Sequence, residues 1–415
     1  MKSLSQDANT IIQRIIAENM PDEAVKQALD KHPLTGDIYM VAIGKAAWTM
    51  AKAAHDFLGD RIKEGIVITK YDHSKGPINR VEIIEAGHPV SDENSLRGTE
   101  RAIALAEQLK EGDVLLFLIS GGGSALFEAP REGISLDDIV KLNNQLLASG
   151  ADIVEMNMVR KRLSKVKAGR FAQIAAPAEV FAIVLSDVLG DRLDSIASGP
   201  TALDEATVED VQKVVENYKL SLTDLQRRYL LDETPKDITN VQTIITGSVK
   251  TLCKSAAAVA YELGYTPVIL TTNLDCEAKE AGRFLASIAA DIQSGSASFK
   301  KPCAIIAGGE TVVHLKGTGC GGRNQELALS AAKGIAALNN VLIFSLGSDG
   351  TDGPTDAAGA IVHNNTLSLL KQQKIDINQA LANNDSYHAL KAINSLIITG
   401  PTGTNVNDVA VLLCP

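Results

Sequence analysis

A chain of 415 residues is too long for one ordinary hydrophobic core, so its length predicts two or three domains. Its 45% hydrophobic and 22% charged residues are typical of a well-packed globular protein. A net charge of −10 and only 4% aromatic residues argue against a nucleic-acid binder, which would need a basic face and stacking surfaces. A small anionic ligand remains compatible with this charge, because local cations matter more than the total.

The first residues, the longest apolar run and the cysteines predict a cytoplasmic protein with no membrane partner. The first residues, MKSLSQDANTIIQRIIAENMP, carry charges throughout and do not resemble a signal peptide. The longest strongly apolar run, residues 114–119, is far too short to span a bilayer. The five cysteines form no CxxC pair and are odd in number, which favours a reducing compartment without a disulfide framework or a zinc ribbon.

Apolar β-branched runs alternate with helical runs along almost the whole chain. Strands are predicted at 38–43, 65–69, 81–85, 114–120, 180–185, 243–245, 266–270, 304–307, 311–314 and 341–346. Helices are predicted at 46–58, 92–109, 136–147, 156–175, 207–217, 248–263, 277–293 and 326–337. This alternation predicts parallel sheets that are covered by helices on both faces.

The polar stretch 232–240, DETPKDITN, is the best candidate for a domain boundary. It predicts a larger Rossmann-like domain at 1–235 and a smaller α/β domain at 236–415. The predicted fold class is therefore α/β, with two three-layer α/β/α domains.

Two loops after predicted strands carry groups that suit an anion. Ligands gather at the carboxyl ends of strands in open α/β sheets. In YMVAIGKAA, Lys45 stands at the start of a helix, where its charge opposes the helix dipole unless an anion binds there. In VLLFLISGGGSAL, Ser120 to Ser124 combine three glycines with two hydroxyl groups, which predicts a backbone nest for an anion. His88, in GHPVSDENS, is better explained as a structural histidine.

Carboxylates follow two other predicted strands. Asp187 and Asp191 lie in VLSDVLGDRLDSIASGPT, and Asp349 lies in IFSLGSDGTDGPTDAAG. Acids at a strand end suit Mg²⁺, which is held through one or two carboxylates together with substrate phosphates. Capping and surface roles for these acids remain the alternative.

The segment KGTGCGGRNQE, residues 316–326, lies between a strand-like and a helix-like run. Glycines let backbone N–H groups approach a phosphate closely, and a helix N-terminus adds partial positive charge. Arg323 would stand at that terminus with a donor fork that matches carboxylates and phosphates. The segment therefore predicts a site for anionic oxygen.

The same segment also reads as GxGxxG, which leaves hydride transfer with NAD(P) as an alternative. Gly322 and Asp349, however, are further apart than the roughly 20 residues of the dinucleotide fingerprint. The polar residues after Gly322 also stand where that helix presents small apolar ones to the sheet. GxxxxGK[ST], HRD and DFG motifs are absent from the sequence, so a kinase of this sequence has none of the common architectures.

Taken together, the loops resemble those of the class II glycerate kinases, a family with a Rossmann-like N-terminal domain and a C-terminal domain of the MOFRL type. Members were formerly often labelled hydroxypyruvate reductases. The resemblance covers nearly the whole chain, and the segments that carry it are VAIGKAA, EAGHPVSDENS, LISGGGSAL, NMVRKRLSKVKAGR, LSDVLGDRLDSIASGPT, AGGETVV, KGTGCGGRNQE, SLGSDGTDGPTDAAGA and DSYHAL followed by TGPTGTNVND.

The resemblance implies ATP-dependent phosphorylation of D-glycerate to 2-phosphoglycerate, with Mg²⁺ or another divalent cation and an active site in the cleft between the two domains. The family's active-site lysine and arginine match Lys45 and Arg323, and Asp187 is the third predicted catalytic residue. Asp187, Asp191 and Asp349 are the predicted metal ligands, and one of them could accept the substrate proton.

The other predicted substrate- and phosphate-binding residues are Ser120, Gly121, Gly122, Gly123, Ser124, Gly319, Gly321, Gly322, Asn324, Glu326 and Glu310. A hydroxypyruvate reductase and a non-catalytic sugar-acid or nucleotide-binding protein stay open as alternatives. A homodimer also stays open.

Overall fold

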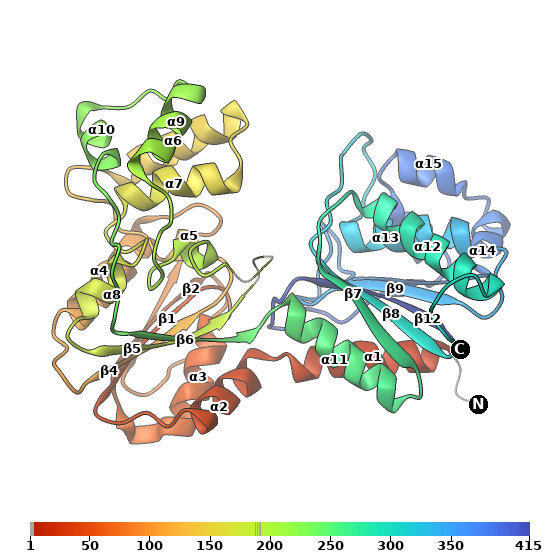
Figure 1. The fold of residues 1–415 in the computed structure, drawn as a ribbon, viewed down its shortest axis with the longest axis horizontal. Coiled ribbons are helices and arrows are strands. Elements are labelled where there is room, and N and C mark those ends of the chain that lie inside the picture. Colours follow the sequence, from red (N-terminus) through yellow and green to blue (C-terminus); the bar gives the residue numbers. More distant parts are fainter. Residues whose placement is uncertain (1–3, 187, 189, 191) are drawn as a thin grey trace. The chain divides into compact units, whose positions relative to one another are not determined.

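The computed structural model describes residues 4–186, 188, 190 and 192–415, and their contacts divide the chain into two compact units. The N-terminal unit comprises residues 21–246, and the C-terminal unit comprises residues 247–415 together with 1–20. Each unit is built on a six-stranded sheet with helices on both faces (Figure 1). The predicted α/β class with two sheet-based units is confirmed.

The sheet of the N-terminal unit pairs its first five strands in parallel. Three of its strands, at residues 38–43, 114–119 and 179–185, are almost wholly apolar, as expected where helices cover both faces of a sheet. In spatial order they are β3 (Val81–Ala86), β2 (Ile62–Lys70), β1 (Ile38–Ile43), β4 (Val114–Ile119), β5 (Glu179–Leu185) and β6 (Val241–Gly247).

Helices of the N-terminal unit form two layers and a separate cluster (Figure 1). On one face lie α2 (Pro21–Lys31) and α3 (Ala47–Leu58), and on the other lie α4 (Glu93–Ala106), α5 (Gly123–Leu126) and α8 (Arg170–Ala175). The cluster has its own apolar core and consists of α6 (Leu136–Ser149), α7 (Ile153–Leu163), α9 (Val208–Asn217) and α10 (Asp224–Leu230). The predicted helix 156–175 is therefore interrupted between α7 and α8.

The sheet of the C-terminal unit is mixed, which corrects the prediction of parallel sheets throughout. Its last strand, β12 (Asp408–Cys414), lies between β8 (Cys303–Gly309) and β9 (Leu342–Gly347) and runs antiparallel to both. The inserted strand satisfies the backbone groups of both neighbours. The sheet is completed by β7 (Thr266–Leu274), β10 (Gly359–His363) and β11 (Leu396–Ile397). The predicted strand 311–314 forms only an isolated bridge at Val312.

The first helix of the chain, α1 (Leu4–Glu18), belongs to the C-terminal unit because its apolar face packs on α11 (Val249–Glu262). These two helices lie on one face of the sheet, and α12 (Ala278–Ser294) and α13 (Arg323–Ile335) lie on the other (Figure 1). The chain also forms α14 (Thr366–Gln372), α15 (Ile377–Ala382) and α16 (Ser386–Lys391). The two units thus divide at the end of β6, between residues 246 and 247, whereas the predicted boundary at 235/236 lies before β6. The limits of the two domains stay a prediction.

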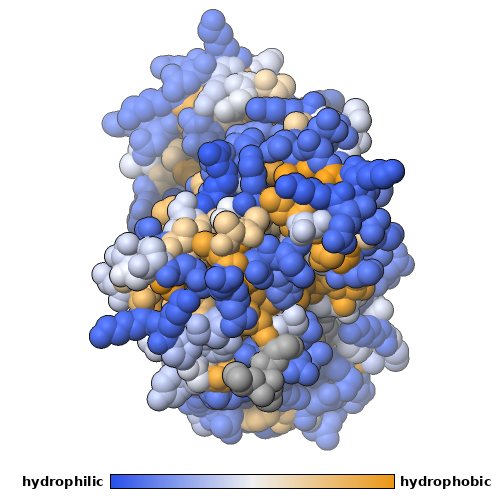
Figure 2. Space-filling model, turned by 90° about the vertical axis from the view of Figure 1, so that its right-hand side faces the viewer, coloured by the Kyte–Doolittle hydropathy of each residue, from blue (hydrophilic) through white to orange (hydrophobic). Residues whose placement is uncertain are grey.

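Within the described part of the chain, no helix is both long and apolar enough to cross a membrane. Figure 2 shows one face of the molecule, on which apolar patches are interspersed with hydrophilic residues. The predicted cytoplasmic location stays a prediction.

Candidate active site

Lys45 and the SGGGS loop lie side by side at the carboxyl edge of the N-terminal sheet. They follow β1 and β4, which are neighbouring parallel strands, so both loops leave the same edge. The N–H of Lys45 donates to the carbonyl of Gly121 (2.9 Å), and the N–H of Ala46 donates to Oγ of Ser120 (3.1 Å). A Cβ at Gly44 would lie 2.3 Å from that Oγ, so only glycine allows this approach. The structure thus brings together two loops that the sequence predicted separately.

His88 joins these loops, although the sequence favoured a structural role for it. A Cβ at Gly122 would lie 3.0 Å from Nε2 of His88 and 3.3 Å from Cγ of Lys45, so both side chains pack against this glycine. Burial, together with the nearby charges of Lys45, Lys70 and His73, lowers the pKa of His88 to about 4. At neutral pH the imidazole is therefore uncharged and can serve as a hydrogen-bonding group beside a cation.

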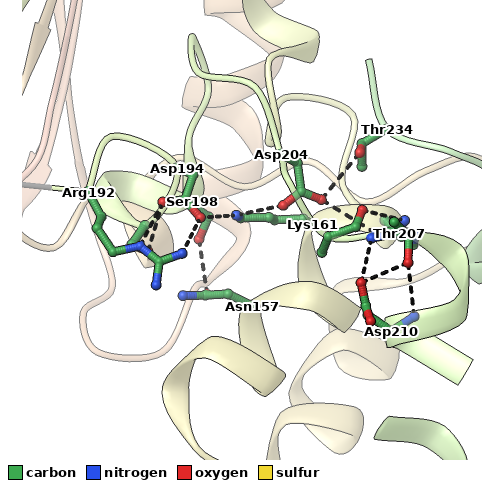
Figure 3. Close-up of polar contacts among 12 residues, drawn as sticks. Asn157, Lys161, Arg192, Asp194, Ser198, Asp204, Thr207, Asp210 and Thr234 are labelled. Carbon is green, nitrogen blue, oxygen red and sulfur yellow. Dashed lines mark hydrogen bonds and ion pairs between the residues drawn. The ribbon is translucent and has the colours of Figure 1, made fainter. Parts of the chain in front are cut away.

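Ser124, at the other end of the SGGGS loop, contacts a turn at residues 197–198 whose backbone is strained. Oγ of Ser198 lies within hydrogen-bond distance of Oγ of Ser124 (3.0 Å) and of Oδ1 of Asn157 (3.4 Å; Figure 3 shows Ser198 and Asn157). Ala197 and Ser198 have φ of 51° and 62°, in the left-handed region that non-glycine residues rarely adopt. The Cβ of Ala197 would come within 2.7 Å of a Cβ at Gly123. Strained backbone of this kind concentrates at functional sites.

A buried ion pair supports the same loop. Nζ of Lys167 donates to the carbonyl of Ser124 (2.6 Å) and pairs with Oε2 of Glu128 (2.8 Å). The two side chains are 0% and 2% exposed, and burial lowers the pKa of Lys167. The sequence missed both residues, because they are 39 positions apart and nothing local marks them as a pair.

A polar cavity of about 210 Å³ lies between α7 and the loops around residues 194 and 205. Nζ of Lys161 donates to Asp194 (3.2 Å) and to Asp204 (3.0 Å), and Arg192 pairs with Asp194 (Figure 3). The cavity is lined by four carboxylate side chains and only two cationic ones. A ligand with hydroxyl groups therefore suits it better than an anionic ligand. Its lining residues are Val154, Asn157, Met158, Lys161, Arg192, Asp194, Ser195, Asp204, Glu205, Ala206 and Asp210.

In the C-terminal unit, Arg323 is the first residue of α13, which begins three residues before the predicted helix 326–337. Its Nε and Nη2 donate to the carboxylate of Asp408 (2.5 and 3.2 Å), and its Nη1 donates to Oε1 of Glu310 (2.7 Å). Burial raises the pKa of Asp408 to about 7, although the guanidinium opposes the rise. Two carboxylates, one 13 and the other 85 residues away along the chain, therefore orient the predicted catalytic arginine.

The glycine-rich loop before α13 packs against residues 383–386. The N–H groups of Gly317 and Gly319 donate to Oδ1 of Asn384 (3.0 Å) and to the carbonyl of Asn383 (2.9 Å). A Cβ at Gly319 or Gly321 would come within 2.4 Å of this segment. These N–H groups already have protein acceptors, and the glycines provide close backbone packing here. Binding roles for Gly319, Gly321 and Gly322 stay a prediction.

Asn324 and Glu326, two further predicted binding residues, are each only 2% exposed. Oδ1 of Asn324 accepts the hydroxyl hydrogen of Ser345 (2.6 Å), and Oε2 of Glu326 accepts from Nδ2 of Asn384 (3.1 Å). Burial raises the pKa of Glu326. In this structure both side chains support α13 from inside the unit, and a role in binding stays a prediction.

Asp352, which lies in the same acidic loop as the predicted ligand Asp349, holds the N-terminus of α13. Its buried carboxylate accepts the N–H groups of Asn324 (3.1 Å) and Gln325 (2.9 Å) as well as both of their side-chain amides. We expect Asp352→Ala to lower the free energy of unfolding by about 2 kcal/mol, the upper range for loss of a helix cap. Urea unfolding measures this, and Asp376→Ala, which removes the exposed cap of α15, should cost less.

The predicted magnesium ligands are only partly within the described residues. Asp187 and Asp191 lie outside them. Asp349 follows β9, and its Oδ1 accepts the N–H of Thr351 (2.9 Å). Among the residues that the structure describes, no group of three or more His, Cys, Asp or Glu side chains is arranged to hold a metal ion. The metal site therefore stays a prediction.

The fold and these loops define a two-unit α/β protein with cationic groups at the edges of both sheets. Residues 7–230 match a domain of unknown function, DUF4147, and residues 303–408 match the MOFRL family. The chain is 54% identical to the D-glycerate 2-kinase of Thermotoga maritima, over 99% of this chain and 98% of that protein. It therefore belongs to the MOFRL-containing glycerate 2-kinase family, which confirms the resemblance seen in the sequence.

Two further similarities complete the comparison. The crystal structure of a glycerate kinase from Thermotoga maritima matches with a TM-score of 0.97, at 54% identity and over 99% of both chains. A relative from Agrobacterium vitis is 41% identical over 91% of this chain and 99% of its own length, and carries a hydroxypyruvate reductase name.

Proposed function

We propose that the protein transfers a phosphoryl group from ATP to the 2-hydroxyl group of D-glycerate. The observation that carries this proposal is the 54% identity to a D-glycerate 2-kinase over almost the full length of both chains. A kinase uses ATP as phosphoryl donor, so ATP is the second substrate. The geometry of the two candidate sites is consistent with this chemistry.

The N-terminal unit is proposed to bind anionic oxygens through Lys45 and the SGGGS loop. Phosphoryl transfer requires mainly positioning and stabilisation of charge on the oxygens of the transferred group. Lys45 supplies the charge, and His88 supplies an uncharged hydrogen-bonding group at its side. The packing of both against Gly122 holds these groups in place before substrate binds.

The C-terminal unit is proposed to contribute Arg323. A guanidinium has five N–H donors, and three of them donate to Asp408 and Glu310. Its planar fork suits a carboxylate or a phosphate.

The proton acceptor and the Mg²⁺ ligands are proposed from the set Asp187, Asp191 and Asp349. Mg²⁺ would neutralise charge on the phosphate oxygens when bound. The roles of Lys45, His88 and Arg323 described above do not depend on it. A cytoplasmic location and a homodimer are retained as proposals from the sequence.

Two assays run side by side test the activity. We expect ADP release that depends on D-glycerate, and no oxidation of NADH by hydroxypyruvate. NMR of the product should show phosphate on carbon 2. NADH oxidation without ADP release would support the reductase instead, and tight binding of D-glycerate or ATP without turnover would support a binding protein.

A further inference from the structure

Two carboxylates hold the Arg323 guanidinium along different edges. Asp408 accepts from Nε and Nη2, so it occupies the side edge of the guanidinium with both of its oxygens. Glu310 accepts from Nη1, the guanidinium nitrogen that Asp408 does not contact. The contacts join three elements: Asp408 begins β12, Glu310 follows β8, and Arg323 begins α13.

The two carboxylates differ in how firmly they are fixed. The side chain of Asp408 is 9% exposed and that of Glu310 is 46% exposed. The backbone of Asp408 pairs with β8 at Gly309 and with β9 at Gly347, so strands on both sides fix it. Exposed ion pairs contribute little, whereas a buried pair is costly to break. Glu310 can therefore leave the guanidinium much more easily than Asp408 can.

Asn407, the residue before Asp408, supports a functional role for residues 407–408. Asn407 has a φ of 65°, in the left-handed region, and is 4% exposed. Its Nδ2 is buried, and the described residues include no hydrogen-bond acceptor for it. Both features cost stability, and such costs are typical of functional segments.

We propose that Asp408 is the positioning residue of Arg323, and that Glu310 occupies the place on the guanidinium that an anionic group of the substrate takes. Asp408 fixes the plane of the guanidinium and leaves free of its own carboxylate the end edge that Nη1 and Nη2 form together. A carboxylate or phosphate can accept from both Nη atoms of that edge once Glu310 has moved. The anion is the carboxylate of D-glycerate or a phosphate of ATP. This inference rests on the proposed function only for the identity of that anion.

The positioning role can be tested by chemical rescue. In Arg323→Ala, added guanidinium should restore part of the lost kcat, because the fixed Asp408 carboxylate can bind it in the place of the side chain. In Arg323→Ala/Asp408→Asn the rescue should disappear. Millimolar guanidinium suffices and is far below denaturing concentrations. Equal rescue in both variants would overturn the positioning role, since a merely structural Asp408 would not affect it.

The role of Glu310 is tested by the Michaelis constants of Glu310→Gln. We expect the KM of one substrate to fall severalfold while kcat changes little, because the competing carboxylate is gone. A lower KM for D-glycerate identifies its carboxylate as the anion, and a lower KM for ATP identifies a phosphate. A higher KM for both substrates would show that Glu310 binds substrate directly. It would overturn the proposal that Glu310 occupies the place of the substrate's anionic group.

Controls separate these outcomes from unfolding and from failure of the proposed function. Glu280→Gln and Arg283→Ala alter an exposed carboxylate–arginine pair in the same unit and should leave all constants unchanged. If Asp408→Asn does not fold, Asp408→Glu replaces it, because it keeps the charge and displaces the carboxylate by one methylene. If the wild-type protein does not phosphorylate D-glycerate, calorimetry with D-glycerate and with ADP replaces kcat and KM in each comparison.

Discussion

Lys45→Ala is expected to lower kcat for D-glycerate phosphorylation by at least about 10², the typical effect of removing one transition-state donor. The backbone of Lys45 is bonded to the SGGGS loop, and its side chain packs on Gly122 beside His88, so the substitution removes a cation from the predicted anion site. Initial rates of ADP release at saturating substrate measure the effect.

A matched control lies on the helix that follows Lys45. Lys52, on α3, is exposed and pairs with Asp56 on the same helix. Lys52→Ala removes the same charge from the same unit and should leave kcat unchanged. Near-wild-type turnover in a folded Lys45→Ala variant would exclude Lys45 from the catalytic machinery.

The sequence places Lys45 and the SGGGS loop at the ends of strands, because that placement depends on local features. Lys45 and the SGGGS loop each follow an apolar strand, and ligands bind at that end of a strand in open α/β sheets. What the sequence does not contain is the strand order. The two loops meet because β1 and β4 are neighbours, although 70 residues, 44–113, separate the end of β1 from the start of β4.

The buried partner of the predicted catalytic arginine, Asp408, could not be predicted, because it comes from far along the chain. Arg323 and Asp408 are 85 residues apart, and their contact depends on β12 inserting antiparallel between β8 and β9. A pattern of alternating strands and helices predicts parallel neighbours and gives no sign of this insertion. The same holds for α1, whose apolar face is obvious but whose partner, α11, lies in the other half of the chain.

The glycine-rich segment 316–326 shows how one pattern can have two physical causes. Glycine allows a backbone N–H to approach a phosphate, and it equally allows two backbone segments to pack without Cβ atoms between them. The N–H groups of Gly317 and Gly319 donate to residues 383–384, so packing explains these two positions. The sequence could not distinguish the causes, since the packing partner begins some 60 residues later.

Lys167→Met is expected to lower the free energy of unfolding by about 3–5 kcal/mol, the cost of leaving a buried charge without its partner. Glu128 would keep its carboxylate in the apolar interior, where it is 2% exposed and where its Oε1 already has no hydrogen-bond partner among the described residues. The carbonyl of Ser124 would also lose its donor. Urea unfolding of the purified variant measures the loss.

Removing both charges should restore much of this stability. A buried ion pair and a neutral pair of similar volume are often nearly equal in stability, because the attraction between the charges is offset by their desolvation. Glu128→Gln/Lys167→Met should therefore unfold at a higher urea concentration than Lys167→Met alone. Lys141→Met, which removes an exposed lysine paired with Asp137, should cost less than about 1 kcal/mol. A double variant less stable than Lys167→Met would show that the pair stabilises the loop through its charges and not only by satisfying Glu128.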